Sequence, residues 1–398
     1  MPGRRIAADA GVTSEGPVTD PTINRIRVYA YASAPHQHPW DGEMAGGTTT
    51  ITFLRLTASD GSEGVSAAMS GNPHCHDSVI AETIRTMMPA IRGMSPLACK
   101  ANWRRLRELG SPQTLKALAA VDTASWDLAG KIAGLPLYRM LGGARDRVLS
   151  YASIPVFADI PAYHDYIADL QAQGFRAVKL HCWCDAERDL PLVRAVAERF
   201  AESGLRFMLD VEQLYSRTEA LAVARELERL GFVWFEAPLP DTDFEGYVEL
   251  RRRVGIPILP AGAAINDPGV LRHAAAMGCW SSFRVDAEYI GGITPLRKAM
   301  ALGEAHGMSV EVLCWGHSLV QAANLHVILA YANCDYFEQS VPYDDFEHCM
   351  LDVIRTEPDG FVRAPEGPGL GLRVDWEAVE AGSIQTFDSA DEERGVRK

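Results

Sequence analysis

Charged side chains follow five of the eight short apolar segments in the second half of the chain, where a buried strand would end. Each one alone is also explained as a helix N-cap or an ion-pair partner, but their recurrence on successive strands favours a functional site. Carboxylates gathered from neighbouring strands suit a hard cation such as Mg²⁺. A Lys or His beside that cation suits removal of a proton next to a carboxylate, because the cation stabilises the resulting enediolate. The residues are Lys179, His181, Asp210, Glu212, Glu236, Asp286, Glu288 and Glu338.

Lys179 and His181 lie two positions apart, as do Asp210 and Glu212. Side chains at positions i and i+2 of a strand point to the same side. We therefore expect Lys179 and His181 to face one common space, and Asp210 and Glu212 to face it as well.

The elements that must position these residues follow a regular rhythm from residue 148 onward. Short apolar strands such as "AVKLH" alternate with amphipathic helices such as "LPLVRAVAERFAESG", and several helices end at a glycine. Eight such units predict an α/β fold with a parallel (β/α) TIM-type barrel, whose functional residues lie at the C-terminal ends of the strands. Three strands and then three helices precede the barrel, which predicts an α+β domain.

The predicted boundaries divide the chain into five parts. They are a flexible tail over 1–23, an α+β domain over 24–147, the barrel over 148–343, a C-terminal segment over 344–383 that returns to the first domain, and a tail over 384–398.

The composition narrows the class of partner. A net charge of −14 argues against nucleic acid and anionic membranes, and no run of 18 apolar residues or signal-peptide pattern is present. The eight cysteines are scattered without a C-x-x-C pair, which indicates free thiols in a reducing compartment. We expect a cytoplasmic homo-oligomer that acts on a small molecule.

Several stretches resemble the enolase superfamily, in its mandelate racemase/muconate lactonizing enzyme branch. They are "AAVDTASWDLAGKIAGLPLYRMLGG", "GFRAVKLH", "WFEAPLP", "VDAEYIGGIT" and "APEGPGLGLRVDW", and the resemblance covers about residues 24–380. It implies that the α+β domain caps the barrel and that the substrate is a carboxylate. The barrel sequence is most similar to those of the sugar-acid dehydratases of this branch.

The resemblance also implies roles for single residues. Lys179 and His181 fall on the K-x-K positions of the second strand, where the second position is usually the catalytic lysine. Asp210 and Glu236 fall on the first two metal ligands. The third ligand is a Glu in an "A-G-E" motif, but this sequence has "AGA" in "PILPAGAAIND" and places Ala263 there. We therefore expect weakened Mg²⁺ binding, with Glu212 or water completing the shell.

The catalytic pair of the family is also incomplete. Asp286 falls on the Asp of a His–Asp dyad, but the His position falls on Leu313. His317 follows four residues later, and we expect Asp286 to orient it or to donate a proton itself. Glu338 matches an acidic group at the eighth strand, and Glu212 lies where some dehydratases place an acid catalyst.

Two histidine pairs lie outside the barrel, in "PHQHPW" and "PHCHD". In the family these stretches lie near the loops that cover the barrel mouth and select the substrate. A His-x-His pair can bind a transition metal, but polar loop residues that contact substrate or solvent are the simpler interpretation. The candidate substrate-binding residues are His36, His38, Trp40, His74, His76 and Glu338.

The sequence thus predicts a lyase that removes a proton alpha to a carboxylate and dehydrates a sugar acid or a hydroxy acid. His181 is the expected base, and Lys179 holds the substrate carboxylate or lowers a neighbouring pKa. The alternatives are a metal-free isomerase or cyclase of specialised metabolism and a catalytically silent ligand-binding homologue.

Overall fold

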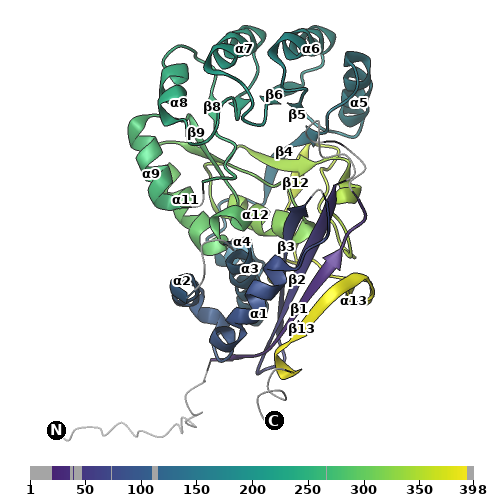
Figure 1. The fold of residues 1–398 in the computed structure, drawn as a ribbon, viewed down its shortest axis with the longest axis vertical. Coiled ribbons are helices and arrows are strands. Elements are labelled where there is room, and N and C mark those ends of the chain that lie inside the picture. The colour runs from purple at the N-terminus through teal and green to yellow at the C-terminus, as the bar shows by residue number, and fades with distance from the viewer. Residues whose placement is uncertain are drawn as a thin grey trace, which may run out of the picture.

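A computed structural model describes residues 20–35, 39, 47–72, 74–109, 115–265 and 267–391. In this part the chain forms the predicted α+β domain and (β/α) barrel, and Figure 1 shows the barrel above the α+β domain.

The α+β domain is an antiparallel sheet in the order β13-β1-β2-β3 with helices on one face. Apolar residues alternate along its strands, so that one face packs against the helices in a closed apolar cluster. The elements are β1 (Ile23–Ala32), β2 (Thr48–Ala58), β3 (Glu63–Asn72), α1 (Val79–Ile91), α2 (Cys99–Leu109), α3 (Leu115–Ala133) and β13 (Ser383–Asp388).

The C-terminal strand corrects the predicted boundary of the last tail. Residues 384–388 belong to β13, which pairs with β1, and Arg25 forms an ion pair of 2.6 Å with Asp388. The preceding segment also touches the barrel, because β12 (Phe361–Arg363) pairs with its first strand. The strand was missed because its six residues are mixed in polarity and its partner lies more than 350 residues away.

The barrel contains the eight predicted parallel strands. A continuous ladder runs in the order β11-β4-β5-β6-β7-β8, and β9 pairs with β10. The Ser281 amide donates to the Ile258 carbonyl at 2.9 Å and bridges the two sheets. The strands are β4 (Arg147–Ile154), β5 (Ala177–His181), β6 (Arg206–Asp210), β7 (Phe235–Glu236), β8 (Ile258–Leu259), β9 (Ser282–Val285), β10 (Ser309–Val312) and β11 (Tyr336–Ser340).

Helices connect the barrel strands and cover them from outside (Figure 1). Several begin at an Asp or Ser whose side chain accepts a backbone N–H, as Asp159 and Ser216 do. The helices are α5 (Ile160–Ala172), α6 (Ala186–Arg199), α7 (Arg217–Leu230), α8 (Phe244–Arg251), α9 (Pro268–Met277), α10 (Ala287–Ile290), α11 (Ile293–Ala305) and α12 (Ser318–Ala330). The short α4 (Leu137–Met140) precedes the first barrel strand, and α13 (Trp376–Gly382) packs on the α+β domain, with the Trp376 ring 5.7 Å from that of Tyr29 in β1.

The barrel interior is layered. Tyr151, Trp234 and Tyr336 belong to an apolar cluster with ring centroids 5.4–6.2 Å apart. Glu236 and Glu338 lie two residues further along β7 and β11, on the same side of their strands. The charged residues therefore form the layer above an aromatic floor, towards the C-terminal ends of the strands.

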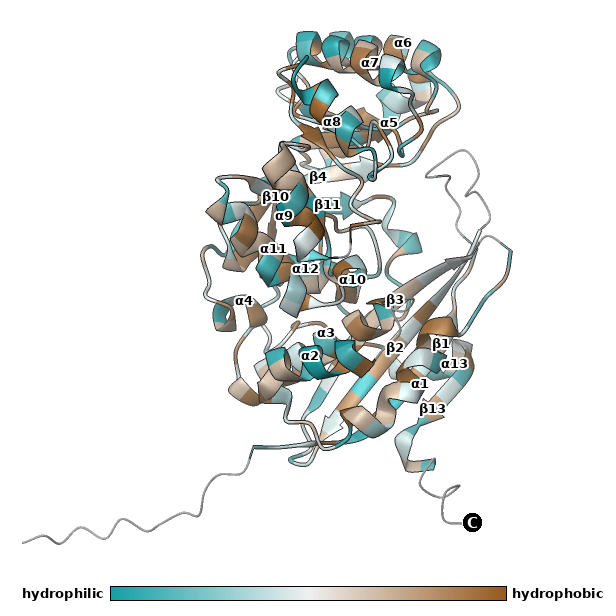
Figure 2. Ribbon diagram, turned by 60° about the vertical axis from the view of Figure 1, so that its left-hand side comes forward, coloured by the Kyte–Doolittle hydropathy of each residue, from teal (hydrophilic) through white to brown (hydrophobic). Residues whose placement is uncertain are grey.

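Figure 2 shows α10, which follows β9 at that end of the barrel, beside α3 and β3 of the α+β domain, and buried polar contacts join the two parts. Asp122 of α3 accepts hydrogen bonds from the Thr294 amide and hydroxyl at 2.8 and 2.7 Å. Glu288 of α10 accepts from the Met69 amide of β3. The first domain therefore caps the barrel mouth, as the resemblance implied.

All eight cysteines are free thiols, and five of them are buried. Within the described residues, no helix combines the length and the apolar character required to cross a bilayer.

His326 joins three segments at the base of the cap. Its Nδ1 accepts the Tyr138 amide of α4 at 3.1 Å, and its Nε2 donates to the Leu370 carbonyl at 3.1 Å. The ring must be neutral to accept at Nδ1, and burial lowers the pKa of His326 to about 4.

We expect acid to remove the stabilisation that His326 provides. Above pH 6.5 the imidazole is neutral in both states. Between pH 6.5 and 4 only the unfolded chain takes up a proton, so stability falls as pH falls. At ~1.36 kcal/mol per pKa unit, lowering the pH from 7.5 to 5 should narrow the difference in unfolding free energy between the native protein and His326→Gln by about 2 kcal/mol.

Urea denaturation at the two pH values measures this difference. The exposed His306 gives a matched control, since His306→Gln should change stability little at either pH. A constant difference between native protein and His326→Gln would show that His326 is not held neutral.

Candidate active site

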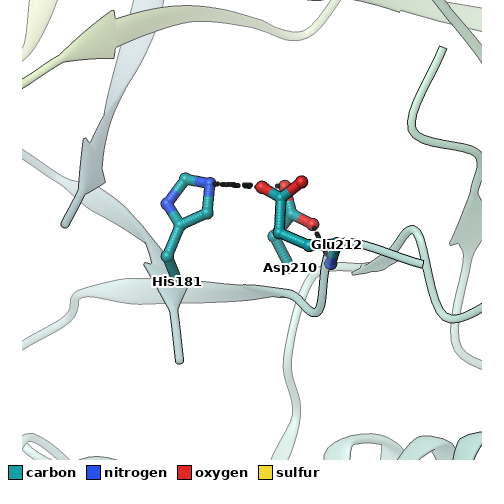
Figure 3. Close-up of side chains that lie close together, drawn as sticks. All are labelled: His181, Asp210 and Glu212. Carbon is teal, nitrogen blue, oxygen red and sulfur yellow. Dashed lines mark hydrogen bonds and ion pairs between the residues drawn. The ribbon is translucent and has the colours of Figure 1, made fainter. Parts of the chain in front are cut away.

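The ring of His181 is fixed at the end of β5. Its Nδ1 lies 2.8 Å from the Ile154 carbonyl, so Nδ1 carries the proton, and the His181 carbonyl accepts the Tyr163 hydroxyl at 2.9 Å. The other nitrogen, Nε2, faces Glu212 at 3.3 Å and Asp210 at 3.6 Å (Figure 3). Burial acts to lower the pKa of His181, but the Glu212 hydrogen bond and the Asp210 charge raise it overall. Nε2 is therefore placed to accept and return a proton.

Glu212 approaches His181 from the turn after β6. Its φ is +51°, and that of Gln213 is +66°, so two consecutive non-glycine residues adopt the left-handed region. The Gln213 amide donates to the Ala237 carbonyl at 2.8 Å and holds this turn. The Glu212 side chain is 38% exposed while that of His181 is 5% exposed, so Glu212 lies between the buried imidazole and solvent. Such strain is concentrated at functional sites.

Two buried cations hold the three carboxylates beneath His181. Lys179 Nζ lies 2.9 Å from Asp210, 2.9 Å from Glu236 and 3.0 Å from Glu338. Arg284 of β9 contacts Glu236 at 2.8 Å and Glu338 at 3.0 Å. The five side chains are at most 6% exposed, so these ion pairs are little screened by water.

The pKa values of the two glutamates are shifted in opposite directions, because burial outweighs the ion pairs at Glu236 and the ion pairs outweigh burial at Glu338. Burial raises the pKa of Glu236 to about 7, although Arg284 and Lys179 act against it. Burial acts on Glu338 in the same sense, but Arg284, Lys179 and the Cys314 amide hold its pKa below the usual value. Glu236 is also close to Asp210, which explains why it is the group that retains a proton more readily.

The structure corrects the predicted pairing of Asp286 with His317. His317 caps α12: its Nδ1 accepts the Leu319 amide at 3.3 Å, and its Nε2 lies 2.9 Å from the His348 carbonyl. Burial lowers its pKa to about 4, and no hydrogen bond joins it to Asp286 in the described part of the chain. His317 therefore does not replace the missing dyad histidine.

Asp286 nevertheless lies in the site as a buried carboxyl. Its Oδ1 accepts the Tyr289 amide at 2.6 Å, and its Oδ2 has no hydrogen-bond partner among the described residues. Burial and the nearby Glu288 raise its pKa well above the usual value. Its second predicted role, as a proton donor, stays open.

The cap supplies a further charge near Asp286. Lys116 Nζ donates to the Met69 carbonyl at 2.7 Å and lies 3.6 Å from Glu288. The side chain of Lys116 is 26% exposed, whereas that of Glu288 is 3% exposed. This pair ties the edge of the cap to the loop after β9.

The two histidine pairs differ in how the structure places them. His36, His38 and Trp40 lie outside the described residues. His74 is exposed and His76 is partly buried, in a loop that the Asp77 amide anchors to Thr50 at 2.9 Å in the cap sheet. Their role in substrate binding stays a prediction.

Two site residues were missed by sequence reasoning. Arg284 lies two positions before Asp286 on a buried strand, and that spacing predicts that both face the barrel interior. Asp241 lies in the loop after β7 and accepts the amides of Ala261, Gly262 and Ala264 at 2.8–3.4 Å. A lone Asp in a "PDTD" turn gave no comparable signal.

Comparison with known proteins supports the fold and the family. Residues 25–142 match the mandelate racemase/muconate lactonizing enzyme N-terminal domain, and residues 162–379 match the enolase C-terminal domain-like family. A candidate mandelate racemase/muconate lactonizing enzyme from Pseudovibrio sp. is 39% identical, with a TM-score of 0.90 over 93% of this chain and 99% of that chain. D-glucarate dehydratase from Agrobacterium tumefaciens, crystallised with magnesium, is 30% identical over 92% of this chain and 99% of that one, with a TM-score of 0.78. D-galactonate dehydratase from Ralstonia pickettii is 30% identical over 75% of this chain and 84% of its own length.

The residues present here do not fit a magnesium ion at the positions that the resemblance implies. Glu236 Oε1 accepts from Lys179 and Arg284, and its Oε2 accepts the Trp234 indole N–H at 3.1 Å. Asp210 is bound to Lys179, and Ala263 has no ligand atom in its side chain. Among the described residues, His181, Asp210 and Glu212 form an alternative set of donors, whose ligand atoms lie within 4.8 Å of one another.

Proposed function

The chain belongs to the mandelate racemase/muconate lactonizing enzyme branch of the enolase superfamily, and we propose that it is a lyase that dehydrates a sugar acid or a related hydroxy acid. The relatives named above include dehydratases of D-glucarate and D-galactonate. Their substrates are small carboxylates, which suits a site that carries buried cations.

One observation carries this proposal: the imidazole of His181 is held with Nε2 directed at Glu212. Nδ1–H is committed to the Ile154 carbonyl, so the basic lone pair lies on the side of the barrel mouth. A general base needs this fixed orientation and a nearby group that can share its proton.

The reaction can be written with residues of this chain alone. His181 Nε2 takes the proton on the carbon next to the substrate carboxylate, and the C–H electron pair enters the carboxylate as an enediolate. Lys179 and Arg284 offset the added negative charge. The enediolate then forms a carbon–carbon double bond and expels the β-hydroxyl group, which takes the proton back from Nε2–H directly or through Glu212. The enol product becomes a 2-oxo acid.

The missing dyad favours this reaction over racemisation. Racemisation needs a base on each face of the substrate carbon, but the second histidine position holds Leu313, and His317 is committed elsewhere. His181 and Glu212 are 3.3 Å apart and act from one face. Removal of the proton and loss of the hydroxyl from that same face need no second base.

An isomerase or cyclase remains the alternative enzyme, because Asp286 could donate a proton to the opposite face if its raised pKa keeps it protonated. A silent ligand-binding homologue remains the alternative from another class.

Incubating the protein with a library of sugar acids and hydroxy acids in D₂O tests these three hypotheses. We expect one or more acids to lose the α-proton signal in NMR spectra and to yield a 2-oxo acid. Exchange without a 2-oxo acid would favour isomerisation. If some acids raise the melting temperature of the protein but show neither proton exchange nor turnover, the proposed enzymatic function is wrong and the ligand-binding homologue is favoured.

A further inference from the structure

We propose that Lys179 and Arg284 together take the place of the divalent cation in this barrel, so that the native protein holds its strand-end carboxylates without a metal. This inference rests on ion pairs and packing and not on a substrate. The inference can therefore be tested separately from the proposed reaction.

The first argument is charge. One ammonium and one guanidinium carry two positive charges, as does one Mg²⁺ ion, and they contact Asp210, Glu236 and Glu338 at 2.8–3.0 Å. A cation bound between Asp210 and Glu236 would have to displace Lys179 from both. The ammonium would then lie beside the metal in a buried layer, where like charges repel strongly.

The second argument is space. Gly262 has φ of +86°, and a Cβ atom there would lie 2.4 Å from the Arg284 carbonyl oxygen and 3.1 Å from its Cγ. The loop that carries Ala263 therefore packs directly on Arg284. Asp241 fixes the same loop through three backbone amides, and Ala263 itself is exposed. Arg284 thus lies immediately beside the position from which the family supplies its third ligand.

The third argument is the unused donor of Arg284. Its Nε and Nη2 are bound to Glu236 and Glu338, but Nη1 has no hydrogen-bond partner among the described residues. A buried donor without an acceptor destabilises the folded state. An oxygen of an anionic ligand would satisfy it, which is the role that a bound cation has towards a substrate carboxylate.

Titration of the purified protein with Mg²⁺ tests the replacement. Isothermal calorimetry and thermal melting should show no binding to the native protein at millimolar Mg²⁺. The double variant Ala263→Glu/Arg284→Gln opens the space and adds the third carboxylate, so it should bind Mg²⁺ at least about 10–100-fold more tightly. Ala263→Glu alone should gain little, because Arg284 remains.

The neighbouring Ala264, which is also exposed, supplies the matched control. Ala264→Glu/Arg284→Gln adds the same charge one position away and should not gain binding. Native protein that binds Mg²⁺, with the binding lost in Glu236→Gln, would overturn the inference without any Arg284 variant. A folded double variant, checked by circular dichroism, that stays as unresponsive as the native protein would overturn it as well.

Discussion

His181→Ala should abolish exchange of the substrate α-proton with deuterated solvent, with a loss of at least about 10²–10⁴-fold. The reason is geometric: Nε2 of His181 is buried, fixed by the Ile154 contact and directed at the mouth. The rate of deuterium incorporation by NMR, with an acid identified in the screen, measures the effect.

Two matched variants show whether the loss is chemical. His181→Asn keeps a donor for the Ile154 carbonyl but has no basic nitrogen, so it should fold normally and fail to exchange. Glu212→Gln leaves the imidazole in place. We therefore expect this variant to retain proton exchange, and its rate of dehydration to fall more than its rate of exchange. If His181→Asn exchanges the proton at the native rate, His181 has no part in the reaction.

The barrel could be predicted because its information is local. Each strand is a short apolar run and each helix has its own period and end signals, so the alternation is visible without any long-range contact. The strand Ser383–Asp388 could not be predicted in this way, because it forms by pairing with β1 at the other end of the chain.

In the site, too, the features that depend on local sequence were predicted and those that depend on distant contacts were not. The spacing of Lys179 and His181 predicted that both side chains face one common space, and in the structure they lie 2.9 and 3.6 Å from Asp210. It did not predict that Lys179 would bind three carboxylates at once, because Glu338 comes from a strand that is distant in sequence. His317 was considered as a replacement because it follows Leu313 by four residues, but its ring accepts the Leu319 amide of α12 and contacts the His348 carbonyl.

The absence of Glu at position 263 is consistent with the position of Arg284 beside the same loop. Lys179 and Arg284 already carry the two positive charges that a divalent ion would bring to Asp210, Glu236 and Glu338, so a third carboxylate ligand at position 263 has no ion to bind. On the proposal made above, Ala263 and the buried pair Lys179 and Arg284 belong to one arrangement of buried charge.

Lys179→Met should have the largest effect on stability of any single substitution in the site. The methionine has a similar length and fits an apolar environment, but it leaves Asp210, Glu236 and Glu338 with Arg284 as the remaining buried cation. Breaking a buried ion pair by removing one partner commonly costs about 3–5 kcal/mol. Urea denaturation at pH 8 measures the loss, and turnover should fall with it.

The pH dependence separates lost charge from lost packing. The pKa of Glu236 is raised to about 7 in the native protein, and removing a cation raises it further. At pH 5 Glu236 is protonated in both folded proteins. Above pH 7 the native protein releases this proton, whereas the variant, with the higher pKa, continues to lose stability as pH rises, so its deficit should be larger at pH 8 than at pH 5. Arg253→Met is the control, because its 2.9 Å pair with Glu249 is exposed on both sides and should contribute about 1 kcal/mol or less. A deficit of Lys179→Met that is small, or the same at both pH values, would mean that Lys179 is not the counter-ion of these carboxylates.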